Sequence, residues 1–163
     1  MAYAYRSLTE LDAAPWQELR MEGVRLFPMG FLTTEAEAEA TYDQARWILG
    51  QGNNRGVFDG PALVGLAGLR RGGLSRIAHS AEIGPFYVTP PHQGQGAARA
   101  LMDGIIAEAR ETALGLLTLH VDSRNARAIR FYERCGFARV ATVPDTVRID
   151  GEPCADHIYH LSL

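Results

Sequence analysis

The sequence of 163 residues contains no lysine, only two cysteines and no long run of apolar residues. Without lysine, no side-chain amine can act as a nucleophile, form a Schiff base or clamp a phosphate. The cysteines, Cys135 and Cys154, fit neither a metal-binding spacing nor a disulfide framework. No stretch reaches the roughly 18 apolar residues of a membrane-spanning helix, so none is predicted. Residues 1–11 include Arg6 and Glu10 and no apolar run, so no signal peptide is predicted.

The chain also lacks a strong charge of either sign, since 16 basic residues oppose 19 acidic ones for a net charge of −3. A nucleic-acid-binding domain usually carries a basic face, so no nucleic-acid partner is predicted. The composition is that of a globular protein and argues against disorder and a coiled coil. The length predicts one domain over residues 1–163, and the absence of targeting and membrane segments predicts a cytoplasmic location.

Hydrophobic periodicity predicts an α+β fold, a mixed sheet of about seven strands flanked by about four helices. Asp59-Gly60 predicts a hairpin turn, and an apolar helical stripe from Leu101 to Ala109 predicts one parallel crossover near Gly96. The expected strands cover residues 3–8, 55–58, 62–70, 77–88, 116–121, 138–143 and 156–161. The expected helices cover residues 11–27, 35–49, a segment beginning near 96, and 125–135.

The segment 88–99 carries the clearest chemical signal. A predicted strand ends at Pro90-Pro91, and small residues then open an amphipathic helix. Small residues let a ligand approach the backbone, and the first N–H groups of a helix bind anions such as pyrophosphate. The Gly-Lys-Ser/Thr ending of a P-loop is absent, and Gly94 and Gly96 match a dinucleotide fingerprint only in part. For this segment taken alone, a structural strand–helix turn is the alternative.

Motifs at both ends of the predicted crossover resemble those of the GNAT N-acetyltransferase superfamily. Gln93, Gly96 and Ala98 form Q-x-x-G-x-A, similar to the family's pyrophosphate-loop pattern Q/R-x-x-G-x-G/A, with alanine as the final residue. Segment 81–88 resembles the family's fourth strand, and segment 125–137 resembles its N-x-x-A-x-x-x-Y-x-x-x-G-F signature. The order of the predicted elements is also similar, so the resemblance covers nearly the whole chain.

The resemblance implies that acetyl-CoA is the co-substrate, and it assigns three parts of the chain to its binding. The pantetheine arm would contact the backbone of Phe86, Tyr87 and Val88 and the side chains of Asn125, Ala128 and Phe131. The pyrophosphate would contact Gln93, Gly94, Gln95, Gly96, Ala97, Ala98 and Arg99.

Acetyl transfer to an amine requires a base for the substrate ammonium and an acid for the leaving thiolate. The resemblance implies that Tyr132 is the acid, and a tyrosine packed in the core is the alternative. Glu82 lies where histone-type relatives place a glutamate base, and a surface or salt-bridged glutamate is the alternative. His120 is the reserve base, and a water chain can also serve. We expect no metal, because His157 and His160, three residues apart in one strand, point to opposite faces.

These inferences predict an acetyl-CoA-dependent N-acetyltransferase that acts by direct attack of a primary amine in a ternary complex. The acceptor is expected to be a small-molecule or peptide amine, bound by residues 27–34 and 143–153. A non-catalytic acyl-CoA-binding sensor or structural module, and a nucleotide-binding regulator, are the alternatives. A homodimer is also expected from the resemblance, because relatives often dimerise.

Overall fold

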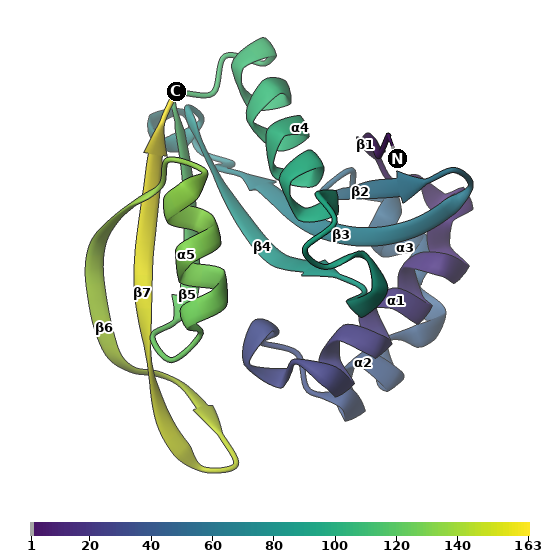
Figure 1. The fold of residues 1–163 in the computed structure, drawn as a ribbon, viewed down its shortest axis with the longest axis horizontal. Helices are drawn as coiled ribbons and strands as arrows, with labels where there is room; N and C mark the ends of the chain where they lie inside the picture. The colour runs from purple at the N-terminus through teal and green to yellow at the C-terminus, as the bar shows by residue number, and fades with distance from the viewer. Residues whose placement is uncertain (1) are drawn as a thin grey trace. The chain divides into compact units, whose positions relative to one another are not determined.

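The structure is a computed structural model and describes residues 2–163. Within them, seven strands form a mixed sheet in the order β1-β2-β3-β4-β5-β7-β6, together with five α-helices (Figure 1). The predicted α+β class and strand number are confirmed. The chain forms two compact units, the first comprising residues up to Leu69 with Pro85–Ala107, the second Arg70–Gly84 with Glu108–Leu163. In this described part, no helix is both long and apolar enough to cross a bilayer.

Three antiparallel strands form the sheet edge of the first unit. β1 (Ala4–Ser7) pairs with β2 (Asn54–Asp59), and β2 pairs with β3 (Ala62–Arg71). The predicted hairpin turn lies between β2 and β3, where Gly60 has a φ of 54°. Glycine enters this left-handed region at little cost, which explains why the turn forms there.

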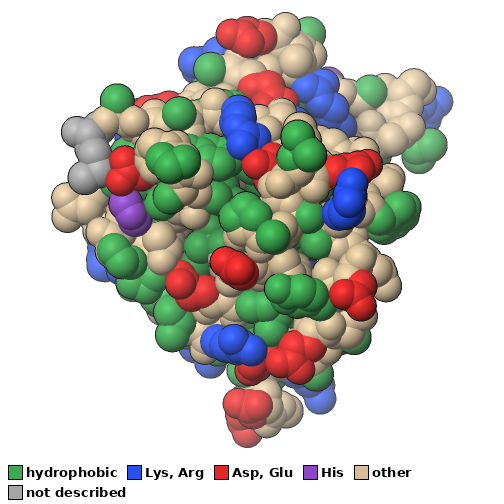
Figure 2. All heavy atoms as spheres, turned by 90° about the vertical axis from the view of Figure 1, so that its right-hand side faces the viewer, with side chains coloured by type: hydrophobic (Ala, Val, Ile, Leu, Met, Phe, Trp, Pro, Cys, Tyr) green, Lys and Arg blue, Asp and Glu red, His purple; other side chains and the backbone are tan. Residues whose placement is uncertain are grey.

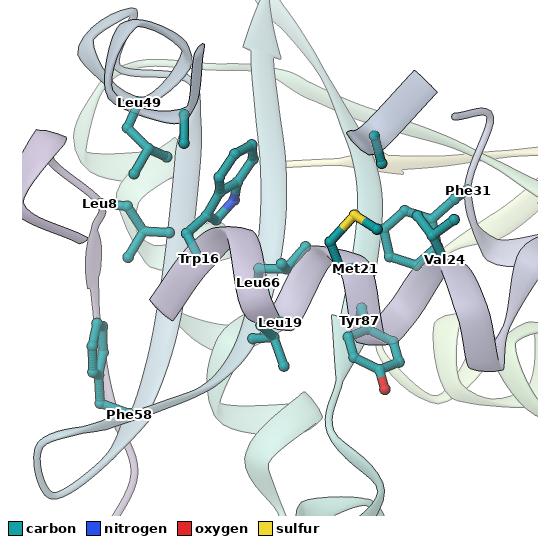
Figure 3. Packing of buried hydrophobic residues seen from close by; sticks show 12 residues of the cluster. Leu8, Trp16, Leu19, Met21, Val24, Phe31, Leu49, Phe58, Leu66 and Tyr87 are labelled. Carbon is teal, nitrogen blue, oxygen red and sulfur yellow. The ribbon is translucent and has the colours of Figure 1, made fainter. Parts of the chain in front are cut away.

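The hydrophobic core of the first unit is built around α1 (Ala13–Leu26), as Figure 3 shows. Gly23 of this helix faces the ring of Phe31, and a Cβ at that position would lie only 2.5 Å from a ring carbon. The glycine therefore allows the close approach of the chain that follows α1. The buried hydrophobic residues of this cluster are Leu8, Trp16, Leu19, Met21, Val24, Phe31, Ala38, Ala45, Leu49, Phe58, Leu66 and Tyr87.

The single helix expected over residues 35–49 is interrupted. The predicted cap is present, because the hydroxyl of Thr34 accepts a hydrogen bond from the third N–H of α2 (Glu35–Ala40) at 3.2 Å. At Thr41, the side-chain hydroxyl donates back to the carbonyl four residues earlier at 3.0 Å, and the backbone leaves the helical conformation. A short 3-10 turn then leads into α3 (Ala45–Gly50). Threonine hydroxyls compete in this way with helix hydrogen bonding, and the described chain consequently has five helices instead of four.

The second unit contains the parallel part of the sheet. The first residues of β4 (Ser80–Val88) pair in parallel with β5 (Leu116–Asp122), and α4 (Ala97–Glu111) connects the two strands in the chain. The predicted parallel crossover is therefore confirmed, although β4 begins slightly later than expected. β5 then pairs antiparallel with β7 (Glu152–Ser162), and β7 pairs antiparallel with β6 (Ala138–Ile149).

The last two strands are longer than predicted. Most of segment 143–153, expected to be a loop, extends the β6–β7 hairpin, which turns at Asp150-Gly151. These two residues have φ values of 52° and 81°, a combination typical of two-residue hairpin turns. The strand pattern was obscured because the register shifts between Val143 and Val147, which interrupts the alternation of side chains.

Candidate functional site

The segment predicted to bind pyrophosphate forms a loop between β4 and α4 in the first unit. After Val88 the chain makes a 3-10 turn (Pro90–His92), and Gln93 folds back so that its Nε2 donates to the Val88 carbonyl at 2.8 Å. Gly94 and Gly96 follow with φ values of 74° and 97°. Helix α4 begins at the next residue and runs for 15 residues. Its first N–H groups have no partner within the helix, so the loop presents backbone donors at the positive end of a helix dipole.

Charged and aromatic side chains flank this loop. The Nε of Arg99 lies 2.8 Å and 2.9 Å from the two carboxylate oxygens of Asp103, and both side chains are more than half exposed. An exposed pair at this spacing contributes less than about 1 kcal/mol, so a phosphate can compete with Asp103 for the guanidinium. On the loop's other flank, the hydroxyl of Tyr3 lies 3.0 Å from Nδ1 of His92, which anchors the loop.

Tyr87 turns its side chain into the helical layer of the first unit. Its ring contacts those of Phe27 and Phe31 at centroid distances of 5.8 Å and 5.9 Å, and its hydroxyl donates to Oε1 of Glu22 at 2.8 Å. Burial and the Glu22 carboxylate raise the pKa of Tyr87 well above its usual value. The side chain is therefore used in packing, and a backbone role in ligand binding stays a prediction for this strand segment.

In the second unit, Tyr132 lies on α5 (Ala126–Arg134) and is buried. The rings of Phe131 and Phe137 pack against it at centroid distances of 5.5 Å and 6.2 Å. Burial, with a smaller effect from Cys135, raises the pKa of the Tyr132 phenol far above its usual value. The phenol is protonated at neutral pH, as an unperturbed tyrosine also is, and its raised pKa makes it a weaker acid than an exposed tyrosine.

Asn125 caps α5. Its Oδ1 accepts a hydrogen bond from the N–H of Ala128 at 3.2 Å, and its own N–H donates to the carbonyl of Asp122 at 2.9 Å. This structural role was not predicted from the sequence, although asparagine is a favoured N-cap residue. Because the cap uses one lone pair of Oδ1, the predicted contact of Asn125 with pantetheine can use its amide nitrogen or the second lone pair.

Glu82, the first candidate base, is ion-paired. A terminal nitrogen of Arg70 lies 2.6 Å from its Oε1, and the other terminal nitrogen donates to the carbonyl of Gly84 at 3.1 Å. The two side chains are about half exposed. The salt-bridged alternative considered for Glu82 is therefore present, and Arg70 binds one of the two oxygens of this carboxylate.

His120, the reserve base, shares a sheet face with Glu82. Glu82 lies opposite Thr118 in the parallel register, and residues two apart on β5 point to the same face. The His120 side chain is 46% exposed, and its Nδ1 lies 3.9 Å from Oδ2 of Asp156 on β7. The structure thus brings the two candidate bases to one face of the second unit.

The candidate acid lies on the other face of this unit. Leu119, which points opposite to His120, pairs with Tyr159, and the Tyr159 hydroxyl donates to Glu133 of α5 at 3.0 Å. Helix α5 therefore covers the face opposite to the candidate bases, and it carries Tyr132. The loop between β4 and α4 belongs to the first unit.

Sequence reasoning missed Glu22, Arg70 and Asp156 as partners of the predicted site residues. Opposite charges on consecutive strands are a signal that could have found the pair of Arg70 and Glu82. The other two contacts join segments far apart in the chain, and no local pattern reports them. Across residues 2–163, no group of three or more His, Cys, Asp or Glu side chains is arranged to hold a metal ion.

The first unit also contains a hollow of about 430 Å³ beside α1. Arg25 at its rim is bound to Glu35 at 2.5 Å and lies 3.5 Å from Glu39. Figure 2 shows hydrophobic side chains gathered on one face of the molecule with acidic and basic ones interspersed. The lining combines two carboxylates and one guanidinium with apolar side chains. The lining residues are Glu18, Met21, Arg25, Glu39 and Tyr42.

Known proteins share both the sequence pattern and the fold. A model of the Acetyltransferase (GNAT) family matches residues 9–137. The L-methionine sulfoximine/L-methionine sulfone acetyltransferase of Salmonella typhimurium is 30% identical over 116 residues, covering 69% of this chain and 65% of that protein. The L-amino acid N-acyltransferase MnaT of Escherichia coli is 28% identical over 116 residues, covering 69% and 64%. This chain thus aligns with somewhat less than two-thirds of the length of either relative.

A solved structure supports the fold over the whole chain. That of yncA from Salmonella typhimurium, determined with its cofactor acetyl-CoA, matches with a TM-score of 0.82 at 20% identity, covering 100% of this chain and 95% of that one. At this identity the likeness concerns the fold.

Proposed function

Because this chain belongs to the Acetyltransferase (GNAT) family, we propose that it is an acetyl-CoA-dependent N-acetyltransferase. The acetyl group passes to a primary amine by direct attack in a ternary complex. The loop between β4 and α4 carries this proposal, because Gly94 and Gly96 hold positive φ values at the N-terminus of a long helix. Such a loop suits a pyrophosphate without any lysine. The family match runs through parts of both units, which supports one N-acetyltransferase domain over residues 1–163.

Donor binding in this proposal uses mainly the backbone. The amides of residues 93–98 hold the pyrophosphate, and Arg99 adds charge from the first turn of α4. The backbone of residues 86–88 pairs with the pantetheine arm. In the second unit, Asn125, Ala128 and Phe131 contact the arm near its thiol end. Acetyl-CoA is the co-substrate, and no metal is assigned.

Tyr132 is the general acid of the proposed reaction. The amine nitrogen attacks the thioester carbonyl carbon to form a tetrahedral intermediate, and that nitrogen loses one proton to solvent. The intermediate collapses with cleavage of the carbon–sulfur bond, the leaving thiolate takes the phenolic proton, and Tyr132 regains a proton from solvent. The place of Tyr132 in the segment that resembles the family's N-x-x-A-x-x-x-Y signature supports this role, and its phenol carries a proton at neutral pH. A backbone N–H near Val88 stabilises the negative charge that develops on the carbonyl oxygen.

The base that deprotonates the acceptor is Glu82 or His120, directly or through water. Glu82 is held by Arg70, whereas His120 is half-exposed beside a buried carboxylate. Their position on one face of the second unit supports an acceptor approaching from that side.

The proposed acceptor is a small-molecule or peptide amine. The two relatives are named for L-methionine sulfoximine or L-methionine sulfone, and for L-amino acids. The hollow beside α1 supports this class, because Glu18 can attract an ammonium group, Arg25 can bind a carboxylate, and Met21 and Tyr42 offer apolar contacts. A cytoplasmic location and a homodimer stay predictions from the sequence.

The donor site is tested by thermal unfolding with acetyl-CoA, free CoA, ATP or NAD. A ligand at 100 times its Kd stabilises the folded state by about 2.7 kcal/mol, which raises the Tm by roughly 5–11 °C for a chain of this size. The proposal expects this rise with the two CoA species. A rise with ATP or NAD and none with CoA contradicts the proposal and favours a nucleotide-binding regulator.

The chemical step is tested by release of the CoA thiol with a panel of primary amines. Replacing Tyr132 with phenylalanine should slow turnover about 10²–10⁴-fold while leaving acetyl-CoA binding intact. Tyr159→Phe is a matched control, because Tyr159 is also buried in the second unit but donates to Glu133. Acetyl-CoA binding without turnover of any amine would favour the non-catalytic sensor instead.

A further inference from the structure

Two aspartates face one another across β5 and β7. Asp122 and Asp156 are register partners, and only 6% and 8% of their surfaces are exposed. A buried carboxylate needs hydrogen bonds or an opposite charge to remain ionised. Asp122 has both, because Arg124 donates to it from its backbone N–H at 2.9 Å, from Nε at 2.9 Å and from a terminal nitrogen at 2.7 Å. These bonds hold the pKa of Asp122 below its usual range.

Asp156 has a different environment. Within residues 2–163, its one ion pair is with His120, whose Nδ1 lies 3.9 Å from Oδ2. Burial raises the pKa of Asp156, the charge of Asp122 raises it further, and His120 and His157 oppose the rise. The buried carboxylate is therefore stabilised most when the imidazole beside it carries a positive charge.

His120 is placed to reach a ligand from the end of β5. Its side chain is 46% exposed, and Nδ1 faces the buried carboxylate, so Nε2 is the nitrogen on the other side of the ring. A carboxylate beside Nδ1 favours the tautomer with the proton on that nitrogen and leaves the lone pair on Nε2. The separation of 3.9 Å exceeds a hydrogen bond, and such contacts often tighten when the substrate binds.

Two of the neighbouring titratable groups are held by other partners. Glu82 is bound to Arg70, and His157 points to the opposite face, where its Nδ1 lies 2.8 Å from the Thr142 hydroxyl. On the face that His120 shares with Glu82, His120 is half-exposed and paired with a carboxylate, whereas Glu82 is paired with a guanidinium. β4, β5 with the turn that follows it, and β7 place further charged or titratable groups around the pair of His120 and Asp156. These groups are Glu82, Asp122, Arg124, Cys154, His157 and His160. On β6, the residue opposite Asp156 is the apolar Val143.

We propose that His120 is the general base for the acceptor amine and that Asp156 is its positioning residue, an inference that rests on the proposed N-acetyltransferase function. Nε2 of His120 takes one proton from the substrate ammonium, which leaves a neutral amine whose lone pair attacks the thioester. The carboxylate of Asp156 orients the ring and stabilises the imidazolium, which later releases the proton to solvent. Glu82 then serves as the partner of Arg70.

The pH dependence of kcat/KM tests the pair. His120→Gln should lower kcat/KM about 10²–10⁴-fold and abolish the acid limb of the wild-type profile. Asp156→Asn should lower it about 10–100-fold and move the acid limb to lower pH, because a neutral amide no longer stabilises the imidazolium. His160→Gln is the matched control on β7 and should retain the wild-type profile. If Asp156→Asn does not fold, the half-exposed His120→Gln still decides the base.

An NMR titration of the imidazole resonances gives a readout that does not depend on turnover. The His120 signal is assigned by its absence in His120→Gln, and its midpoint should fall in Asp156→Asn but not in His160→Gln. An unchanged midpoint, or a wild-type acid limb in His120→Gln, would overturn the pair. A wild-type protein that binds acetyl-CoA but turns over no amine would refute the proposed function and the role of His120 as a base. In that case the NMR titration would still test the contact between His120 and Asp156.

Discussion

Replacing Gly96 with alanine tests whether the loop between β4 and α4 binds the acyl donor through its backbone. Gly96 has a φ of 97°, and a Cβ built there meets no atom within 4 Å. The substitution therefore introduces backbone strain without a steric clash. An alanine at this position can relieve the strain by returning to negative φ, which turns the N–H groups at the start of α4 away from the loop.

The magnitude follows from the cost of the left-handed conformation. For a residue with a Cβ this cost is roughly 1–2 kcal/mol. If the loop relaxes in the free protein, acetyl-CoA must restore the strained conformation on binding, and its affinity should fall about 5–30-fold. Gly52 is the matched control, because it has a similar φ of 75° and a Cβ at this position would also meet no atom within 4 Å. It lies in a different turn of the chain.

Isothermal titration calorimetry with acetyl-CoA and thermal unfolding of both variants measure the two effects. Gly52→Ala should lower the Tm by roughly 2–8 °C and leave the acetyl-CoA affinity unchanged. Gly96→Ala should bind acetyl-CoA about 5–30-fold more weakly than the wild type. Wild-type affinity in Gly96→Ala would refute the assignment of this backbone to the pyrophosphate.

Three further predictions concern stability. Arg6 lowers the pKa of Asp12 to about 2, so the contribution of Asp12 is present above pH 4 and is lost as the pH falls toward 2. Asp12→Asn should therefore cost roughly 1–2 kcal/mol at pH 7, allowing for the half-exposed guanidinium, and the difference from wild type in urea unfolding should shrink below pH 4. Gly104→Ala should cost about 1–3 kcal/mol, because its methyl group would overlap the ring of Tyr5, and an unchanged urea midpoint would contradict that packing. Thr34→Ala removes the cap of α2 and should lower the free energy of unfolding, measured by thermal denaturation, by about 1 kcal/mol. Thr34→Ser keeps a hydroxyl and should retain most of the stability of the wild type.

Much of the fold could be predicted because its signals are local. The stripe from Leu101 to Ala109 is buried along α4, and the strand signals on either side of that helix match the parallel crossover. The Asp59-Gly60 turn and the Thr34 cap each depend on residues close together in the chain. Periodicity and turn chemistry report such features well.

Other features depend on contacts that no local pattern reports. The break at Thr41 arises because a hydroxyl competes with the helix, and residues of this type also occur inside intact helices. The extension of β6 was hidden by its register shift, although Asp150-Gly151 is a hairpin signal. In the candidate site, the Glu82 and His120 partners were set by strand pairing, which sequence periodicity does not determine.

The most direct test of the proposed function is the stoichiometry of transfer. Purified protein would be incubated with acetyl-CoA and single L-amino acids or short peptides, and mass spectrometry would quantify the acetylated amine beside the released CoA thiol. Acetyl transfer to an amine predicts equal amounts of the two products, both strongly reduced in Tyr132→Phe. Thiol release without an acetylated amine, or no release with any acceptor despite bound acetyl-CoA, would contradict it.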